Sequence, residues 1–329
     1  MTMKALSLAA PNKLEIVEKP IPKPTRKGQV LIKMAYSPIN PSDLAFLTGQ
    51  YGIQKPFPVV PGFEGSGVVI ESGGGFYANY LKGKNVACVA SEKGDGTYAE
   101  YMLTDATKCV VMGDNVSLEQ GSMSFVNPLT AIELAEMAKK GGYTAIVMSA
   151  AASALSNMVN YQAKKNGLAF GGVVRRKEQV DKLTTWGVDY IANSSEENWK
   201  KDLHAWAKPH KKVLFLDAVG GGDLPSEILS CMPPKSKMVV YGMLDLENIP
   251  RISPRDFIFY EYEVAGYWLS KTVARKSFIQ AMKDTRKVQA MLKDGFETAI
   301  NKKLSLDNFG EALQTYTKNM SAGKVLFEL

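Results

Sequence analysis

The stretch VMSAAASALSNM (residues 147–158) joins an apolar run to a pattern that is typical of an amphipathic helix. The preceding run, TAIVMSA (residues 144–150), has the composition of a buried β-strand. Apolar side chains then recur at helical spacing at Leu155, Met158 and Val159. Small residues separate the two patterns, which therefore predict a strand, a tight turn and a helix.

This turn has the position of a phosphate-binding loop. Ala151, Ser153 and Ser156 hold the spacing of G-x-G-x-x-G, but none of them is glycine. Alanine and serine are the next smallest residues, and a serine hydroxyl can donate to phosphate or cap the helix. Two interpretations stay open: a nucleotide loop whose extra Cβ atoms weaken binding, or a turn that binds nothing. As a nucleotide loop it would use Ala151, Ala152, Ser153, Ala154, Leu155 and Ser156.

Strand-like and helix-like runs alternate on both sides of this loop. AFGGVV (residues 169–174) precedes KEQVDKLTTWG, and VLFLDAVGGG (residues 213–222) precedes DLPSEILSCM. Continuous apolar strands between amphipathic helices predict a parallel sheet that is covered on both faces. We therefore expect an α/β domain with a doubly wound parallel sheet over residues 122–265.

The first part of the chain has a different pattern. Short runs rich in β-branched and aromatic residues, such as QVLIKMAY (residues 29–36) and NVACVA (residues 85–90), are separated by turn signals. They predict a β-rich, barrel-like domain over residues 1–121. The tail, residues 266–329, carries one helical pattern and a final strand, GKVLFEL.

Composition excludes several classes of protein. The formal net charge is +7 over 329 residues, but the lysines are scattered and form no long basic block, so nucleic-acid binding is not expected. There is no apolar run of 18 residues, so no membrane span is expected. An odd number of widely separated cysteines and no apolar leader pattern indicate a reducing, cytoplasmic location. The two histidines, in a polar stretch, are interpreted as surface residues.

Two arginines follow the second strand of the sheet. Proteins that bind NAD(H) place an acid there, about 20 residues beyond the loop, to bind the ribose 2′-hydroxyl. This sequence has Arg175 and Arg176 instead. A guanidinium pair would bind a 2′-phosphate, so the pattern favours NADP(H), although arginines after a strand are often simply solvated.

The stretch SPINPSDLAFLTGQYGIQKPFPVVPGFEGSGVV (residues 37–69) resembles the zinc-free branch of the medium-chain dehydrogenase/reductase superfamily. That branch holds quinone oxidoreductases and 2-enoyl thioester reductases. The motifs GTYAEY, VNPLTA, LDAVGG, VAGYWLS and SAGKVLFEL follow in the expected order. The resemblance implies a GroES-like catalytic domain, completed by the tail, and a Rossmann domain, with the cofactor in the cleft between them.

Residues 37–69 also indicate whether the protein binds a catalytic zinc ion. Zinc-dependent relatives use two cysteines and a Gly-His-Glu histidine, and catalytic zinc needs three such ligands. Here INPSD has no cysteine, Phe63 stands in place of the histidine, and there is no four-cysteine cluster. No metal is therefore expected, which argues against alcohol oxidation of the zinc-dependent kind.

The resemblance also implies site residues. INPSDLAFLTGQYG looks most like the 2-enoyl thioester reductases, in which the tyrosine of G-x-Y assists reduction as an acid; the matching residue is Tyr51. A phenol has a pKa near about 10, so it is protonated at neutral pH and can donate to a developing enolate. The alternative is a turn aromatic that packs on KPFP. Asn40 and Thr130 match positions that line the nicotinamide and substrate cleft. Further matches near the cofactor are Val219, Gly220, Tyr241, Gly242, Met243, Trp268 and Lys324.

Three functions follow from these patterns. The first is an NADPH-dependent reductase of an α,β-unsaturated thioester or carbonyl. The second is an NADPH:quinone oxidoreductase on the same scaffold. The third is a non-catalytic relative that keeps the fold but has lost cofactor binding, as the glycine-free loop would suggest. The partner is a small-molecule substrate in the first two cases, and relatives imply a homodimer through the edge of the Rossmann sheet.

Overall fold

The computed structural model describes residues 1–245 and 247–329. The chain divides into two compact units: unit 1 comprises Met1–Val126 and Thr285–Leu329, and unit 2 comprises Asn127–Asp284. The second division falls after Asp284, whereas the sequence patterns predicted a boundary after residue 265. It lies inside a helix, α11 (Phe278–Lys293), while the first division lies at the start of α4 (Val126–Lys140).

Unit 1 is built on a seven-stranded sheet with the order β14-β15-β3-β4-β5-β7, in which β6 also pairs with β3. A separate antiparallel pair, β1 (Thr2–Ala10) and β2 (Lys13–Pro20), accompanies the sheet. The strands of the sheet are β3 (Gln29–Pro38), β4 (Glu64–Ser72), β5 (Asn85–Val89), β6 (Tyr101–Asp105), β7 (Cys109–Val111), β14 (Ile300–Ser305) and β15 (Lys324–Glu328). The helices of unit 1 are α1 (Pro41–Leu47), α2 (Phe76–Leu81), α3 (Leu118–Ser122) and α12 (Phe309–Lys318).

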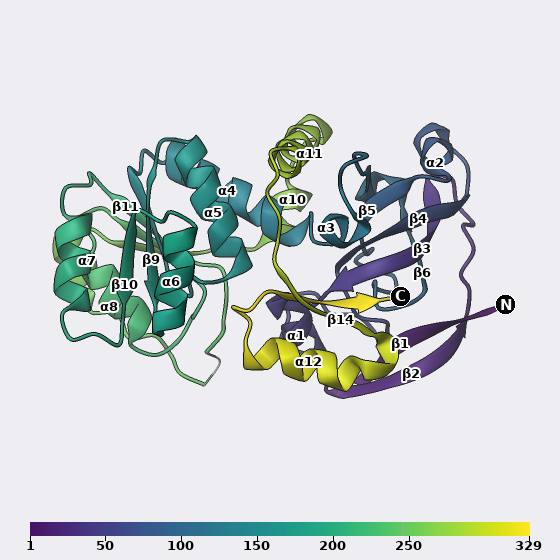
Figure 1. Cartoon of the computed structure of the whole chain (residues 1–329), viewed down its shortest axis with the longest axis horizontal. Helices are drawn as coiled ribbons and strands as arrows, with labels where there is room; N and C mark the ends of the chain where they lie inside the picture. The colour runs from purple at the N-terminus through teal and green to yellow at the C-terminus, as the bar shows by residue number, and fades with distance from the viewer. Residues whose placement is uncertain (246) are drawn as a thin grey trace. The chain divides into compact units, whose positions relative to one another are not determined.

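The last strand lies in the interior of unit 1. β15 pairs in parallel with β14 and antiparallel with β3, so chain segments from the two ends of the sequence lie side by side (Figure 1). Val325, Leu326 and Phe327 are fully buried. A strand that is covered on both faces needs a continuous apolar run rather than alternation, and this sequence supplies one.

Unit 2 contains a six-stranded parallel sheet in the order β10-β9-β8-β11-β12-β13. Counted from the first strand of the unit, this is the 3-2-1-4-5-6 order of dinucleotide-binding domains. The strands are β8 (Ala145–Met148), β9 (Ala169–Val174), β10 (Tyr190–Asn193), β11 (Val213–Asp217), β12 (Lys237–Val240) and β13 (Glu263–Gly266). All residues of β8 and β11 are buried.

Helices cover this sheet on both faces. Figure 1 shows α5 (Ala154–Lys165) and α6 (Lys177–Thr185) on one side of the strands, with α7 (Trp199–Ala207) and α8 (Leu224–Ser230) on the other. Two further short helices, α9 (Pro254–Tyr260) and α10 (Leu269–Ala274), follow β12 and β13. The predicted fold class, a β-rich domain with a doubly wound α/β domain, is confirmed.

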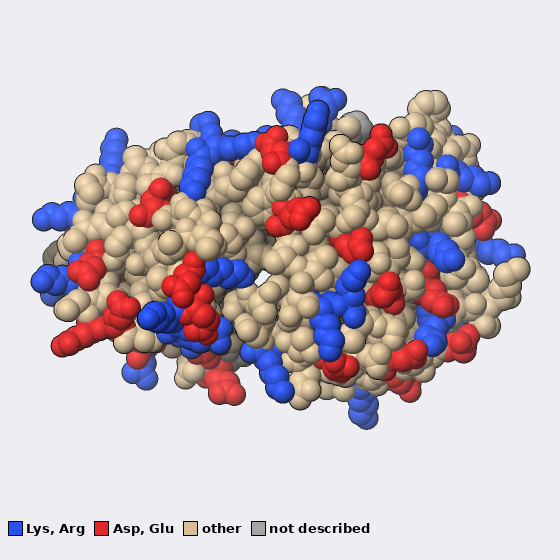
Figure 2. All heavy atoms as spheres, viewed as in Figure 1, with Lys and Arg blue, Asp and Glu red and all other residues tan. Residues whose placement is uncertain are grey.

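Two general features of the sequence reappear in the structure. No helix within the described residues is both long enough and apolar enough to cross a membrane. On the face seen in Figure 2, lysine and arginine side chains are interspersed with acidic ones.

Candidate active site

The predicted cofactor residues of unit 2 follow the strands of its sheet. Because the strands are parallel, their carboxyl ends meet at one edge, which is where such sheets bind ligands. The loops after β8, β9, β11 and β12 all leave from this edge. The strand order reverses at β8, so the loop that begins at Ser149 lies at the switch point of the sheet.

Serine 153 caps the helix that follows this loop. Its side chain accepts a hydrogen bond of 3.2 Å from the Ser156 amide, and its own backbone is extended. Ala150 takes the left-handed conformation, with φ of +48°, which turns the chain into α5. The amides of Ala154 and Leu155 lie in the first turn, where a helix offers no carbonyl partner. They are therefore suited to a phosphate acceptor.

The loop tolerates alanine because the neighbouring strand supplies the missing space. Ala151 and Ala152 are buried. Gly172 of β9 faces Ala151, and a Cβ on this glycine would lie 2.9 Å from the Ala151 Cβ. The close approach of strand and loop, which usually needs glycine in the loop, is obtained here from glycine in the strand.

Ser156 carries a buried hydroxyl group near the start of α5. The residue is 1% exposed, and its Oγ has no hydrogen-bond partner among the described residues. Native structures rarely leave a buried hydroxyl unsatisfied, so each such group calls for an explanation. An anion that accepts from Ser156 and from the first-turn amides would satisfy it, and the donor set therefore fits a pyrophosphate.

Arg175 and Arg176 follow β9 and are exposed. Both of their amides donate to Gln179 Oε1 at 3.2 Å, which fixes the turn into α6. The Arg176 guanidinium lies 3.0 Å from Glu178 Oε1. An exposed guanidinium pair at this edge has the charge and shape that a phosphate group requires.

Two residues that the sequence analysis did not select, Ser149 and Asp217, organise the loop after β11. Ser149 Oγ donates to Asp217 Oδ1 at 2.6 Å and accepts from the Ala218 amide at 2.9 Å. The same carboxylate accepts from the amides of Val219 and Gly220 at 3.1 Å and 2.9 Å. An acid at the end of the wholly apolar run VLFL was the signal that could have identified Asp217.

The loops after β11 and β12 touch through their backbones. A Cβ on Gly220, which has φ of +73°, would lie 2.8 Å from the Gly242 carbonyl oxygen. Tyr241 precedes this contact, and its hydroxyl is buried with no partner among the described residues. Burial raises the pKa of Tyr241, and the Asp217 carboxylate adds to the effect. Met243, the third residue after β12, is 42% exposed.

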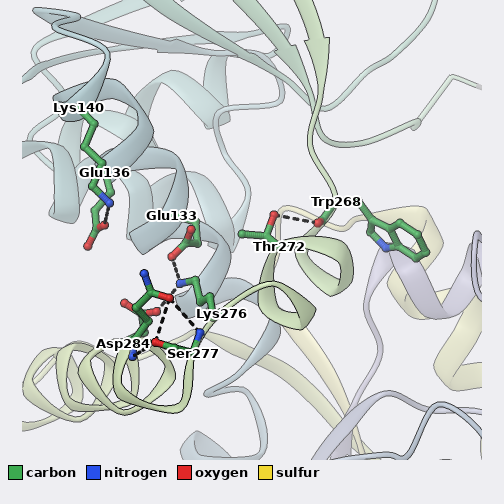
Figure 3. Close-up of polar contacts among 9 residues, drawn as sticks. Glu133, Glu136, Lys140, Trp268, Thr272, Lys276, Ser277 and Asp284 are labelled. Atoms are coloured by element: carbon green, nitrogen blue, oxygen red, sulfur yellow. Dashed lines mark hydrogen bonds and ion pairs between the residues drawn. The ribbon is translucent and has the colours of Figure 1, made fainter.

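Thr130 and Trp268 complete the predicted residues of unit 2. Thr130 is buried within α4. Trp268 is the N-cap residue of α10, and its side chain is 37% exposed. Its carbonyl oxygen accepts from the Thr272 amide and from Thr272 Oγ1, each at 3.1 Å (Figure 3).

Asn40 and Lys324 lie together in the interior of unit 1. Lys324 Nζ donates to Asn40 Oδ1, and Asn40 Nδ2 donates to Glu64 Oε1 at 2.9 Å. Glu64 Oε2 in turn accepts from the amides of Phe125 and Val126, at 3.1 Å and 3.0 Å. Asn40, Glu64 and Lys324 are each less than 5% exposed. This network fixes the orientation of the Asn40 amide and holds the last residues of unit 1 before the chain enters unit 2.

Burial is the main cause of the pKa shifts of the ionisable groups in this network. Asp43, which accepts from the Asn40 amide at 2.8 Å, is fully buried, and burial raises its pKa to about 7 although that hydrogen bond opposes the shift. Burial likewise raises the pKa of Glu64, against the opposing effect of Lys324. Burial lowers the pKa of Lys324, while Glu64 and Asp43 oppose the change. Glu64, missed in the sequence analysis, could have been recognised as an acid inside the apolar run GFEGSGVV.

Tyr51 lies beyond the end of α1, half-buried against aromatic rings. Its ring centroid is 5.0 Å from that of Phe63, with an interplanar angle of 44°. Phe63 makes an edge contact with Phe46 at 5.6 Å. Both Tyr51 and Phe63 pack on the small cluster of Leu8, Phe46, Leu47 and Val59. Tyr51 is therefore a partly buried tyrosine whose ring packs on an apolar cluster.

The predicted residues thus form one set in each unit. Asn40, Tyr51 and Lys324 belong to unit 1, and the others belong to unit 2. Within unit 1, Lys324 contacts Asn40 directly. The roles of all these residues stay predictions. Among the residues that the structure describes, no group of three His, Cys, Asp or Glu side chains is arranged to hold a metal ion.

Two family models match the chain. Residues 26–114 match the alcohol dehydrogenase GroES-like domain, and residues 154–286 match the zinc-binding dehydrogenase domain. The two matches fall in the β-rich unit and mainly in the parallel-sheet unit, respectively.

Solved and curated relatives agree with these matches. A crystal structure of a candidate NADPH:quinone reductase from Mesorhizobium loti is 32% identical, with a TM-score of 0.90, and the match covers 100% of this chain and 98% of that one. The mitochondrial enoyl-[acyl-carrier-protein] reductase of Arabidopsis thaliana is 25% identical over 260 residues. That match covers 75% of this chain and 66% of the relative, so the chain matches slightly less than two thirds of that protein.

A third comparison shows the fold alone. Etr1p, named as a mitochondrial 2-enoyl thioester reductase from Candida tropicalis, has a structure described as a complex with NADP and crotonyl-CoA. It is 18% identical, with a TM-score of 0.83 and 100% of both chains covered.

A β-rich GroES-like unit with a 3-2-1-4-5-6 parallel sheet defines an oxidoreductase scaffold of the alcohol dehydrogenase type. The chain belongs to the medium-chain dehydrogenase/reductase superfamily, in the branch of the quinone oxidoreductases and 2-enoyl thioester reductases. The family predicted from the sequence is confirmed.

Proposed function

We propose that the chain is an NADPH-dependent reductase of α,β-unsaturated thioesters or carbonyls that works without a metal. The observation that carries this proposal is the N-terminus of α5, which lies at the same edge of the sheet as Arg175 and Arg176 and holds the Ser156 hydroxyl, a buried group with no partner in the part of the chain that the structure describes. Relatives named as enoyl-[acyl-carrier-protein] reductases support the choice of acceptor. The Etr1p structure, described with NADP and crotonyl-CoA, supports the cofactor.

The residues of unit 2 are proposed to bind the cofactor, which supplies a hydride from its nicotinamide ring when bound. The first-turn amides of α5 and Ser156 would hold the pyrophosphate. Arg175 and Arg176 would bind the 2′-phosphate, which distinguishes NADPH from NADH. Thr130, Val219, Gly220, Tyr241 and Trp268 are proposed to line the nicotinamide side.

The residues of unit 1 are proposed to handle the proton. Tyr51 donates from its phenol to the carbon or oxygen that becomes basic as the substrate β-carbon accepts hydride. Its ring packs on the Phe63 ring, which in turn contacts the Phe46 ring. Both polar atoms of the Asn40 side chain are already bonded within the network, so Asn40 is proposed to shape the site rather than to exchange a proton.

A quinone is the second candidate substrate. It is favoured by the relative from Mesorhizobium loti, which is similar over its whole length. A quinone accepts hydride without a dedicated proton donor at carbon, so this activity would not depend on Tyr51.

A substrate panel tests the proposal and separates the candidates. The purified protein is assayed for NADPH oxidation with crotonyl-CoA, a simple enone and a benzoquinone, and the products are identified. Reduction of the enoyl thioester or the enone at its carbon–carbon double bond is expected. Turnover of the quinone alone would favour the second candidate. Absence of both NADPH binding and turnover would favour a non-catalytic relative.

We further propose that the protein is a homodimer through the edge of the unit 2 sheet. β13 is the outer strand of that sheet, and its Val264 is 41% exposed. The adjacent helix α9 buries none of its residues, and Ile258 and Phe259 are 68% and 72% exposed. An apolar, unpaired edge strand is an association surface unless it is covered. Sedimentation of the native chain and of Phe259→Glu tests this, since a monomer in both cases would contradict it.

A cytoplasmic location is also proposed. Cys88, Cys109 and Cys231 are buried free thiols, as expected in a reducing compartment. The curated relatives are named as mitochondrial. Fractionation of cells that express the tagged chain decides between these two reducing locations.

A further inference from the structure

The residue before Trp268 is anchored, since the Tyr267 amide donates to the Val240 carbonyl oxygen at 2.9 Å, but the helix that follows Trp268, α10, has no such anchor in the core. None of the residues of α10 is buried. Thr272 binds the Trp268 carbonyl oxygen through both its amide and its hydroxyl. Trp268 and the first turn of α10 are therefore one rigid piece, and whatever fixes α10 also fixes the Trp268 backbone.

Lys276, just beyond α10, connects this piece to the body of unit 2. Its Nζ donates to Glu133 of α4 and to Asp284 of α11, so one ammonium group joins two carboxylates from two helices (Figure 3). The side chains of Lys276, Glu133 and Asp284 are only 15%, 16% and 9% exposed. Ion pairs this well shielded from water are screened much less than surface pairs.

The charge of Lys276 favours a lasting contact with Glu133 and Asp284. Burial lowers the pKa of Lys276, but the hydrogen bonds to Asp284 and Glu133 outweigh burial and hold this pKa above its ordinary value. The ammonium therefore stays charged at neutral pH. Its removal would take away the ammonium that two shielded carboxylates share, which is unfavourable.

The two partner helices have a special place in the chain. α4 begins at Val126, where the chain passes from unit 1 to unit 2, and α11 contains the return passage after Asp284. Lys276 thus ties α10 to the two helices that carry these passages.

We propose that Lys276 is a positioning residue for Trp268: by joining Glu133 and Asp284, it holds α10 and thereby sets the place of Trp268. The inference rests on the proposed reductase function, because Trp268 is proposed to lie beside the nicotinamide. Lys276 itself has no contact with the reacting atoms in this account.

A double-mutant cycle tests this proposal. Lys276→Met, Trp268→Leu and the double variant are prepared in the full chain. Lys276→Arg keeps the charge, and Lys140→Met removes an exposed lysine from an ion pair on the same α4 helix. Glu133→Gln, which removes only the tie to α4, provides a milder variant. The measurements are kcat/KM for NADPH with the best acceptor, and amide hydrogen exchange over residues 267–276.

Lys276→Met is expected to lower kcat/KM by roughly 10- to 100-fold, the scale of misplaced active-site groups. Trp268→Leu should lower it by a similar factor, and the double variant should lose no more than the worse single variant. Exchange over residues 267–276 should rise about tenfold in Lys276→Met, and less in Glu133→Gln. Lys276→Arg and Lys140→Met should resemble the native chain.

Two results would overturn the proposal. One is unchanged exchange over residues 267–276 in Lys276→Met, and the other is independent, multiplicative losses of kcat/KM in the double variant. The exchange measurement needs no substrate. If the native chain reduces none of the acceptors while exchange still rises as expected, the proposed function fails but the anchoring by Lys276 stands.

Discussion

Lys324 and Asn40 are joined by a direct side-chain hydrogen bond in the interior of unit 1, although 284 residues separate them in the sequence. Lys324 was expected to contact the cofactor, and that role stays a prediction. The contact that the structure shows makes Lys324 the cation of a buried network with Asn40, Glu64 and Asp43.

Replacing Lys324 by methionine should strongly destabilise the fold. The variant keeps most of the side-chain volume but leaves the buried Asn40 Oδ1 without its donor and removes the cation near Glu64 and Asp43, which should cost about 3 kcal/mol. The free energy of unfolding is measured by urea denaturation. Lys140→Met, which removes a lysine whose side chain is 76% exposed, serves as the control and should lose less than about 0.5 kcal/mol. Equal losses in the two variants would contradict the network.

Asp43 should make stability depend on pH. Its pKa is raised from 3.8 to about 7 in the folded chain, so the folded chain binds the extra proton between these values. The contribution of Asp43 to stability is therefore complete below the unfolded pKa and is lost as pH rises through about 7.

The variant Asp43→Asn isolates this effect, because an amide oxygen can still accept from the Asn40 amide. Between about pH 5 and pH 7, the free energy of unfolding of the native chain should fall by roughly 2–3 kcal/mol relative to that of the variant. Urea denaturation at several pH values measures both. Parallel pH profiles would show that Asp43 does not titrate in this range.

Tyr51→Phe should lower kcat for an enoyl thioester by roughly 100-fold or more, because the variant lacks the proton donor. The ring and its contact with Phe63 are retained, so the free energy of unfolding should change little. Turnover of a quinone is the internal control and should be nearly unaffected. If the variant reduces its best enoyl substrate at a near-normal rate, Tyr51 is not the acid.

Ser156→Ala should change stability and cofactor affinity in opposite directions. Removal of a buried hydroxyl that has no partner within the described part of the chain should raise the free energy of unfolding of the cofactor-free protein by about 1 kcal/mol. If this hydroxyl donates to the pyrophosphate, the Kd for NADPH should rise roughly 5- to 10-fold. Denaturation and fluorescence titration measure the two effects. An unchanged Kd would place the pyrophosphate elsewhere.

The sequence was sufficient where local patterns decide the structure. The apolar runs of β8 and β11 predicted buried parallel strands, and Ser153, placed just before a helical pattern, is the N-cap of α5. The cap and the strand were predictable because each depends on neighbouring residues.

Contacts between distant residues were not predictable in this way. The space that admits Ala151 comes from Gly172 on another strand. The structure divides the chain after Asp284 rather than after residue 265. Lys276, which lies between these two positions, forms an ion pair with Glu133, 143 residues away in the sequence. No periodicity in a single sequence encodes such pairings.

Titration shows whether a loop without glycine binds NADPH. The purified chain is titrated with NADPH and with NADH while nicotinamide fluorescence is followed, and the Arg175→Ala/Arg176→Ala double variant is titrated in parallel. NADPH is expected to bind at least about tenfold more tightly than NADH, and the double variant is expected to lose this preference. Failure of both nucleotides to bind at hundreds of micromolar would contradict the account.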